Sequence, residues 1–220
     1  MPAFIFDMDG TMVDSMPWHM RSWEAFALEV NGAPLDAEFV RKTSGMTGVE
    51  VMRAHFGDRP EHELQAMVHR KERLYRDMFE PVFTEVRGFM AFARAAHEAG
   101  IKLACATAGD RENIRFVHDN LGCHELFDAV VGAHDVERGK PHPDLFLLAA
   151  SRVGVDPAEC LVFEDATHGI ESARRAGMRA VAITTMIPAE VLGAPGHVVA
   201  SVPDFTTLEP ADLLVRLGKH

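Results

Sequence analysis

The stretch Phe4-Ile5-Phe6-Asp7-Met8-Asp9-Gly10-Thr11 decides the expected fold, because an apolar run stops there at two carboxylates. The three apolar residues before Asp7 are consecutive and β-prone, which is typical of a central strand in a parallel sheet covered on both faces. Gly10 permits a sharp turn directly after the strand. Open α/β sheets bind ligands at the carboxyl ends of their strands, so we expect Asp7 and Asp9 in a functional site.

Asp7 and Asp9 are one residue apart, and like charges this close raise each other's pKa unless a cation or hydrogen bonds intervene. A divalent ion such as Mg²⁺, which prefers oxygen ligands, would let both stay ionised. A second interpretation is that one carboxylate attacks an electrophile while the other transfers protons. A solvated acidic turn is the third, and the spacing alone leaves all three open.

The string Asp7-Met8-Asp9-Gly10-Thr11 after an apolar strand resembles the first motif of the haloacid dehalogenase-like (HAD) superfamily. Three later stretches resemble its further motifs in the same order: Thr107 after Leu103–Ala106, Lys140 within Gly139–Asp144, and Glu164-Asp165 after Cys160–Phe163. The resemblance covers essentially the whole chain. It implies an α/β fold with a Rossmann-like parallel sheet, and an Mg²⁺-dependent enzyme.

The resemblance also implies a role for each motif residue. Asp7 would be the nucleophile that accepts a phosphoryl group, and Asp9 the general acid and base. The second aspartate argues for phosphate chemistry, because dehalogenases of the superfamily lack it. Lys140 would neutralise Asp7 and the transferring group. The implied metal ligands are Asp7, the backbone carbonyl of Asp9, Asp165 and, as a ligand or behind one, Glu164; the implied phosphate contacts are Gly10, Thr107, Ala108 and Lys140.

Some of these residues have simpler interpretations. Thr107 fits a helix cap as well as a phosphate contact, and Lys140 without its flanking motif fits a solvated loop lysine. Alternate side chains of a strand point to opposite faces, so only one of Glu164 and Asp165 is expected to face a metal directly.

The composition is that of a globular protein with an acidic surface. Of 220 residues 47% are hydrophobic, enough for one large α/β domain or a core with a small insert. A net charge of −11 disfavours nucleic acid and anionic membranes as partners, but not a small anionic substrate held by local cations. The three cysteines form no Cys-x-x-Cys pair, which predicts neither a disulfide framework nor a thiolate zinc site. No leader pattern and no apolar run of ~20 residues occurs, so we expect a cytoplasmic protein without a membrane span.

Residues 15–83 contain no convincing strand pattern. Helices are expected from Ser15 to Asn31, over 34–40, from Val49 to Phe56 and from Glu61 to Phe79. In the family that this chain resembles, a small α-helical cap follows the first motif and is joined to the core by two linkers. A cap over residues 15–83 and a core over 1–14 and 84–220 are therefore expected, with substrate specificity on the underside of the cap.

From Gly88 onward, helical patterns alternate with strand patterns. Strands are expected over Lys102–Ala106, 129–131, 160–163, 180–183 and 198–199, and helices over 89–99, 111–121, 143–153, 169–176 and 210–217. This alternation predicts a parallel sheet with helices on its faces.

Within the superfamily, the place of the insert and several local matches resemble the β-phosphoglucomutase-like branch, which also contains sugar-phosphate phosphatases. The substrate contacts that this resemblance implies are Ser15, His19, Gly45 and Lys71. Taken alone, His19 and Lys71 fit solvated helix positions equally well.

Two positions depart from the mutase pattern. Ser44 stands where the mutase has lysine, and Gly48 where it has the arginine that holds the second phosphate of the substrate. Each lost charge-assisted contact costs about 1.5–3 kcal/mol, which favours a phosphatase. The mutase stays as the alternative, with a substitute cation from Arg41, Lys42 or Arg73.

A non-catalytic phospho-acceptor switch, as in response-regulator receivers, is a hypothesis of another class. The long insert and the second carboxylate at Asp9 argue against it. The sequence therefore predicts an Mg²⁺-dependent phosphatase acting on a small phosphorylated metabolite, with a sugar phosphate as the expected class. We expect a monomer or a homodimer.

Overall fold

A six-stranded parallel sheet forms the centre of the computed structural model, which describes residues 2–33, 35, 38–39, 43, 46–186, 188–192 and 196–218. The strands are β1 (Ala3–Phe6), β2 (Lys102–Ala106), β3 (Ala129–Val131), β4 (Cys160–Glu164), β5 (Arg179–Ile183) and β6 (Val198–Val202). Their order is β3-β2-β1-β4-β5-β6, so β1 lies in the middle between β2 and β4. The chain order reverses at β1, which places a crevice at the carboxyl ends of these strands.

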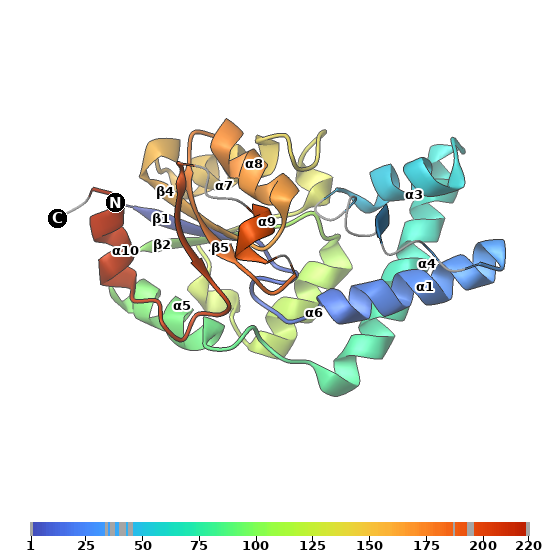
Figure 1. Ribbon diagram of the computed structural model, residues 1–220, viewed down its shortest axis with the longest axis horizontal. Coiled ribbons are helices and arrows are strands. Elements are labelled where there is room, and N and C mark those ends of the chain that lie inside the picture. The colour runs from blue at the N-terminus through green and yellow to red at the C-terminus, as the bar shows by residue number, and fades with distance from the viewer. Residues whose placement is uncertain are drawn as a thin grey trace.

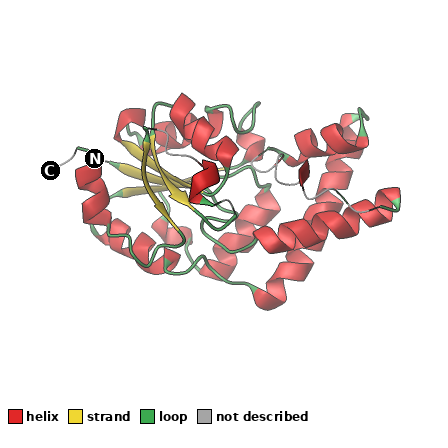
Figure 2. Ribbon diagram, viewed as in Figure 1, coloured by secondary structure: helices red, strands yellow, loops and turns green. Residues whose placement is uncertain are grey.

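Helices cover both faces of the sheet (Figures 1 and 2). One face packs against α5 (Phe89–Glu98), α6 (Arg111–Leu121) and α10 (Pro210–Arg216), and the other against α7 (Asp144–Val153) and α8 (Thr167–Arg175). Phe4 and Phe6 point to the first face, where Phe6 stacks on Phe163 of the neighbouring strand at 4.6 Å between ring centroids. Ala3 and Ile5 point to the second face. This double burial explains why β1 is a continuous apolar run.

In its described residues, the chain between β1 and α5 is mostly helical, and these helices lie at one end of the sheet (Figure 1). It contains α1 (Met16–Asn31), α3 (Gly48–Phe56), α4 (Glu61–Phe79) and the short 3₁₀ turn η1 (Glu80–Val82). Its helices share a hydrophobic cluster separate from those of the sheet: Trp23, Phe26, Ala27, Leu35, Val51, Met52 and Leu64.

The two segments that lead into and out of these helices pair with each other. Asp14 N donates to Thr84 O at 3.1 Å, and Val86 N donates to Met12 O at 3.0 Å. The two connecting segments are thus hydrogen-bonded side by side, and α4 of the insert also packs against α6, where Tyr75 and Phe79 join the core of the sheet. The division into a core and a cap at residues 14 and 84 stays a prediction.

The α/β fold class is confirmed, and the predicted strands and long helices agree with the structure to within three residues at each end. The helix predicted over 34–40 lies mostly outside the described residues. Sequence patterns missed the single turns η2 (His124–Leu126), η3 (Ala133–Asp135) and η4 (Pro157–Glu159) and the short helix α9 (Ala189–Leu192). Elements of three or four residues are too short to show a hydrophobic period.

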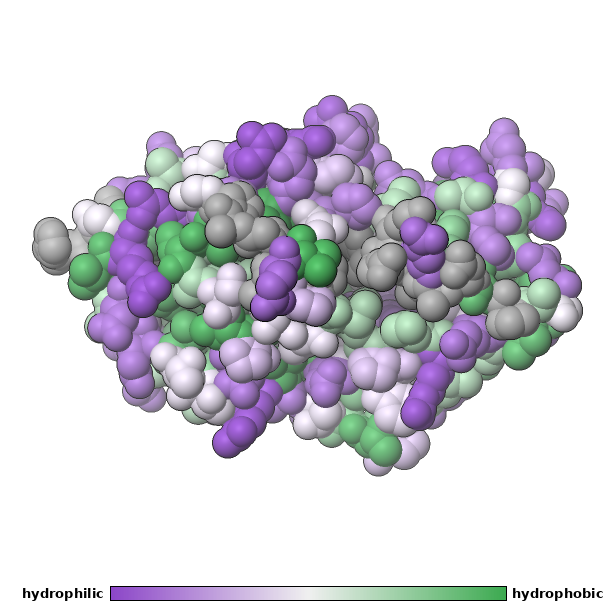
Figure 3. All heavy atoms as spheres, viewed as in Figure 1, coloured by the Kyte–Doolittle hydropathy of each residue, from purple (hydrophilic) through white to green (hydrophobic). Residues whose placement is uncertain are grey.

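Hydrophilic and hydrophobic side chains are interspersed over the face shown in Figure 3. In the described ranges, the large hydrophobic side chains that are exposed are scattered over several elements: Leu28, Val30, Val82, Leu147, Val191 and Val215. No helix within those ranges is both long and apolar enough to span a bilayer.

Candidate active site

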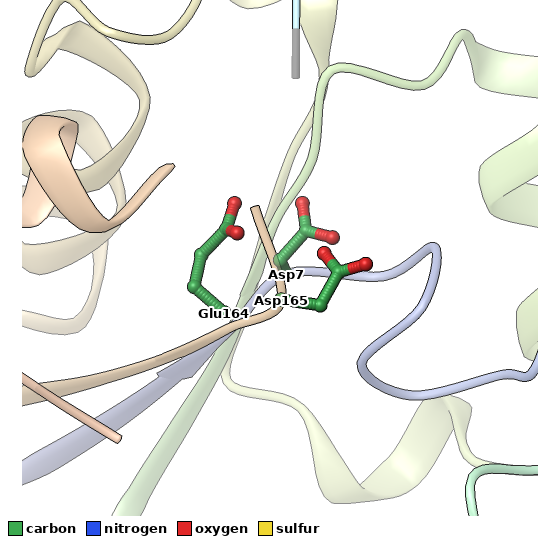
Figure 4. Close-up of side chains that lie close together, drawn as sticks. All are labelled: Asp7, Glu164 and Asp165. Atoms are coloured by element: carbon green, nitrogen blue, oxygen red, sulfur yellow. The ribbon is translucent and has the colours of Figure 1, made fainter. Parts of the chain in front are cut away.

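Three carboxylates meet at the carboxyl ends of β1 and β4. Asp7 directly follows β1, Glu164 is the last residue of β4, and Asp165 comes next. The two strands are hydrogen-bonded neighbours, and one oxygen of each side chain lies within 4.8 Å of the others. Figure 4 shows the three carboxylates gathered beyond the strand ends. All three residues are buried, so three acidic groups are held together away from water.

Both Glu164 and Asp165 reach this cluster, and the expectation that only one of them faces a metal directly stays a prediction. The strand ends at Glu164, and alternation no longer applies to Asp165 in the turn that follows. Two glycines leave room for the side chains. A Cβ atom would lie 2.0 Å from Asp165 Oδ2 at Gly10 and 1.8 Å from Glu164 Oε1 at Gly169.

Lys140 is the cation that reaches the cluster. Its Nζ donates to Asp7 Oδ1 at 2.5 Å and to Glu164 Oε1 at 2.6 Å, and the side chain is 1% exposed. The other Glu164 oxygen accepts from Ala166 N at 2.7 Å. Lys140 is therefore a buried ion-pair partner, and the interpretation as a solvated loop lysine is wrong. One ammonium group faces three carboxylates.

The crowding of acidic groups around one lysine shifts the pKa values of these side chains. Burial raises the pKa of Asp7 to about 8; Lys140 opposes this shift and Glu164 adds to it. Burial and the charges of Glu164 and Asp7 hold the pKa of Asp165 well above its ordinary value. Burial alone would lower the pKa of Lys140, but the attraction of Asp7 and Glu164 raises it.

Asp165 Oδ2 is buried and accepts no hydrogen bond from any described residue. A buried acceptor without a partner is costly, and a cation beside it would remove that cost. The oxygen donors of Asp7 and Asp165 suit a hard divalent ion such as Mg²⁺. The donor set therefore fits the predicted metal.

Asp9 lies outside the cluster and is held by groups from the helical insert and its entry. Its Oδ1 accepts from Ser15 Oγ at 2.7 Å and Tyr75 OH at 3.2 Å, and lies 3.1 Å from His19 Nε2. Burial raises the pKa of Asp9, but the nearby His19 and the hydrogen bond from Ser15 outweigh burial, so the pKa is lower than usual.

His19 connects Asp9 to Lys71. Lys71 Nζ lies 2.7 Å from His19 Nδ1, and an ammonium group has only protons to donate, so Nδ1 is the acceptor. The ring proton of neutral His19 then sits on Nε2 and faces Asp9. Lys71 is 1% exposed and lies over the Trp23 ring, so neither it nor His19 is a solvated helix residue.

Thr107 follows β2 and borders the same cleft as Asp7. Its Oγ1 accepts from Gly109 N at 2.9 Å, while the cap of α6 is Asp110, which accepts from Asn113 N at 2.8 Å. The helix-cap interpretation of Thr107 is therefore wrong.

The cleft between the sheet and the insert has a volume of about 110 Å³. Most of the predicted site residues line it: Asp7, Asp9, His19, Lys71, Thr107, Ala108, Glu164 and Asp165. Lys140 and Ser15 do not line the cleft themselves. Lys140 contacts the lining residues Asp7 and Glu164, and Ser15 contacts Asp9. Gly10 N donates to Val13 O, and the contact of Gly10 with phosphate stays a prediction. Gly45 lies outside the described residues.

Sequence reasoning missed four residues that shape the site: Glu72, Tyr75, Asn113 and Gly169. Tyr75 lies one helical turn after Lys71 and is the only tyrosine of the chain, which was a usable signal. Glu72 and Asn113 meet only because α4 lies against α6, and no local pattern reports that contact.

Gly169 gives a test of the packing around Glu164. Alanine is normally favoured over glycine inside a helix by about 1 kcal/mol, yet here a methyl group would overlap the Glu164 carboxylate. We expect Gly169→Ala to lower the free energy of unfolding by about 1–3 kcal/mol in urea titrations. Gly196→Ala, where an added methyl meets nothing within 4 Å, is the control. A stabilised Gly169→Ala variant would contradict this packing.

Comparison with known proteins gives the family. The model of the haloacid dehalogenase-like hydrolases matches residues 1–177. Hexitol phosphatase A of Escherichia coli K12 is 32% identical over 218 residues, which cover 97% of this chain and 98% of the relative. Fructose-1-phosphate phosphatase of the same strain is 34% identical over 186 residues, which cover 81% of this chain and 94% of the relative.

Among solved structures, β-phosphoglucomutase from Clostridium difficile is similar to this chain with a TM-score of 0.85 and 26% identity, covering 99% of this chain and 97% of that one. The predicted enzyme class, a HAD-like phosphoric monoester hydrolase, is confirmed. The chain belongs to the haloacid dehalogenase-like hydrolases and, within them, to the β-phosphoglucomutase-like branch.

Proposed function

We propose that this protein is an Mg²⁺-dependent phosphatase that hydrolyses a small phosphorylated metabolite, with a sugar phosphate as the substrate class, through a phosphorylated Asp7. The observation that carries the proposal is the meeting of Asp7, Asp165 and Lys140 at the ends of two neighbouring strands, beside an Asp9 held by the helical insert. The phosphatases among the relatives support the same reaction and a sugar-phosphate substrate.

The reaction takes two steps. In the first, a carboxylate oxygen of Asp7 attacks phosphorus, the bond to the ester oxygen breaks, and Asp9 gives that oxygen its proton. In the second, Asp9 takes a proton from water, the water oxygen attacks phosphorus, and the Asp7 carboxylate leaves. Lys140, 2.5 Å from Asp7 in the free site, stabilises the negative charge that develops near this carboxylate.

Asp7, Asp165 and the carbonyl of Asp9 would hold the metal ion. Glu164 would support them from behind, because its two oxygens already accept from Lys140 and Ala166 N. The chemistry that a bound Mg²⁺ ion supplies is neutralisation of charge on the phosphoryl oxygens and on the attacking carboxylate.

Removing the Asp165 carboxylate tests the metal site without an activity assay. A ligand at 100 times its Kd stabilises the folded state by about 2.7 kcal/mol, which raises Tm of a chain of this size by roughly 5–10 °C. We expect this rise when saturating Mg²⁺ is added to the EDTA-treated wild type, and less than about 2 °C in Asp165→Asn. Asp212→Asn, an exposed change on α10, should keep the wild-type response. An equal Mg²⁺ response in Asp165→Asn would remove this residue from the metal site.

Residues 15–83 are proposed to act as a cap that closes over the site. Ser15, His19 and Tyr75 already reach Asp9, so closure would order the acid and base as it excludes water. The three cysteines are buried and unpaired, which supports the predicted cytoplasmic location. A monomer or homodimer stays a prediction.

The mutase alternative is less favoured because position 48 leaves no space for a cationic side chain. A Cβ atom at Gly48 would lie 2.7 Å from Val68 Cγ1. Arg73 is exposed and does not belong to the described lining of the cleft. Arg41, Lys42 and Ser44 lie outside the described residues.

A ³¹P NMR time course decides between the reactions. Purified protein with Mg²⁺ is given fructose 1-phosphate in one sample, and β-glucose 1-phosphate with a trace of glucose 1,6-bisphosphate in another. We expect free phosphate over many turnovers with at least one ester. Glucose 6-phosphate without free phosphate would establish the mutase, and at most one phosphate per chain would indicate a phospho-acceptor switch.

A further inference from the structure

Glu72 is a buried carboxylate at the place where the active-site cleft opens outward. It follows Lys71 on α4, and its side chain is 12% exposed. It borders both the cleft and an adjoining groove of about 570 Å³, together with Gly48, Ala108 and Gly109. A leaving group that extends from the cleft into this groove would lie beside this carboxylate.

Two hydrogen bonds hold Glu72 in place and leave acceptor capacity unused. Its Oε1 accepts from Lys71 Nζ at 3.0 Å, and its Oε2 accepts from Asn113 Nδ2 at 2.7 Å. Arg76 donates to Asn113 Oδ1 at 2.7 Å, which fixes the amide with its NH₂ group toward Glu72. A carboxylate offers about four lone-pair sites, so Glu72 can also accept from a hydroxyl of a bound molecule.

The groove beyond Glu72 is lined mainly by acidic side chains among its charged residues. The charged side chains among the described residues of the groove are those of Glu50, Glu61, Glu72, Asp110, Glu137 and Arg53. Arg53 is already paired with Glu61 at 2.8 Å and lies 3.4 Å from Asp58. Burial raises the pKa of Glu72, but Lys71, His19 and the hydrogen bonds from Asn113 and Lys71 outweigh burial, so the carboxyl stays ionised at neutral pH.

We infer that Glu72 determines specificity for the leaving group, by accepting a hydroxyl of an uncharged polyol and repelling a second phosphate. The inference rests on the proposed phosphatase function and narrows its substrate class to monophosphate esters of neutral polyhydroxy compounds. A second phosphate would lie beside a fixed carboxylate at a wall where Gly48 has no side chain to offset the repulsion.

The test compares kcat/KM for fructose 1-phosphate with kcat/KM for fructose 1,6-bisphosphate, from initial rates of phosphate release. We expect the wild type to prefer the monophosphate by at least about tenfold, and Glu72→Gln to lose roughly that factor, as expected from removing one charge a few ångströms from a second phosphate. Glu72→Asp keeps the charge and should keep the preference. Glu63→Gln, the same change at an exposed position of α4, is the matched control.

The ratio of the two kcat/KM values separates a change in substrate preference from structural damage. In Glu72→Gln the side-chain NH₂ must face either Lys71 or Asn113, both donors, so both rates fall together and the ratio reports only the lost charge. If the protein releases phosphate from fructose 1-phosphate but the ratio is unchanged in Glu72→Gln, the inference is overturned. The phosphatase proposal would still stand. A wild type that prefers the bisphosphate, or a Glu72→Asp variant that behaves like Glu72→Gln, would also overturn the inference. A wild type without turnover of any phosphate ester would instead remove the proposed function.

Discussion

Asp7→Asn is expected to lose phosphatase activity by at least roughly 1,000-fold while the chain keeps its fold. An amide oxygen is a poor nucleophile toward phosphorus, so the first step stops. Phosphate release from fructose 1-phosphate at saturating Mg²⁺ gives the measurement. Acid quenching during turnover should trap a phosphorylated wild-type chain and no phosphorylated variant.

The fold of this variant should survive because Asp7 is one of two buried carboxylates that Lys140 contacts. Lys140 keeps its contact with Glu164. The pKa of Asp7 is raised from 3.8 to about 8, so in metal-free protein its contribution to stability is lost as pH rises from about 4 to about 8. We therefore expect Tm in EDTA to fall less steeply across this range in Asp7→Asn than in the wild type.

Asp14→Asn is the matched control, since it makes the same chemical change at an exposed position on the same connecting segment. It should retain wild-type turnover. Substantial activity in a folded Asp7→Asn variant, with no amide hydrolysis detected by mass spectrometry, would exclude Asp7 as the nucleophile.

The core of the site was predictable because its residues follow strands at fixed places. Asp7 and Asp165 come directly after buried apolar runs, and a parallel sheet brings such positions to one edge. Lys140 was predictable only through its motif. Its loop shows no periodicity, and its two ion pairs join residues 133 and 24 positions away in the chain.

The outer part of the site was not predictable, because its residues meet only through the packing of separate elements. Glu72 lies on a strongly polar helix, where the sequence predicts a solvated side chain, and it is buried only because α4 lies against α6. The carboxylate at Glu164 needs a glycine five residues later, and that requirement follows from the path of α8 over the strand end. Both features depend on how elements dock, which local pattern does not specify.

Asp9→Asn is expected to slow hydrolysis of fructose 1-phosphate by roughly 100- to 10,000-fold, the usual range for loss of a general acid and base. In the free protein Ser15, His19 and Tyr75 all contact Asp9 Oδ1 and favour its ionised form, the form that takes a proton from water in the second step. For the first step Asp9 must carry a proton, and the negative charge of a bound phosphate raises its pKa toward that state.

The two roles of Asp9 can be separated by the leaving group. p-Nitrophenolate leaves without a proton, so with p-nitrophenyl phosphate the first step of Asp9→Asn should proceed at nearly the wild-type rate while the second stays slow. Rapid mixing should then show a burst of one p-nitrophenolate per chain, followed by slow turnover with phosphorylated Asp7 accumulating. If the burst phase slowed as much as fructose 1-phosphate hydrolysis, Asp9 would be acting on the attack of Asp7 itself. If steady-state hydrolysis of both esters were unchanged, Asp9 would have neither role, and the proton would have to come from a different group.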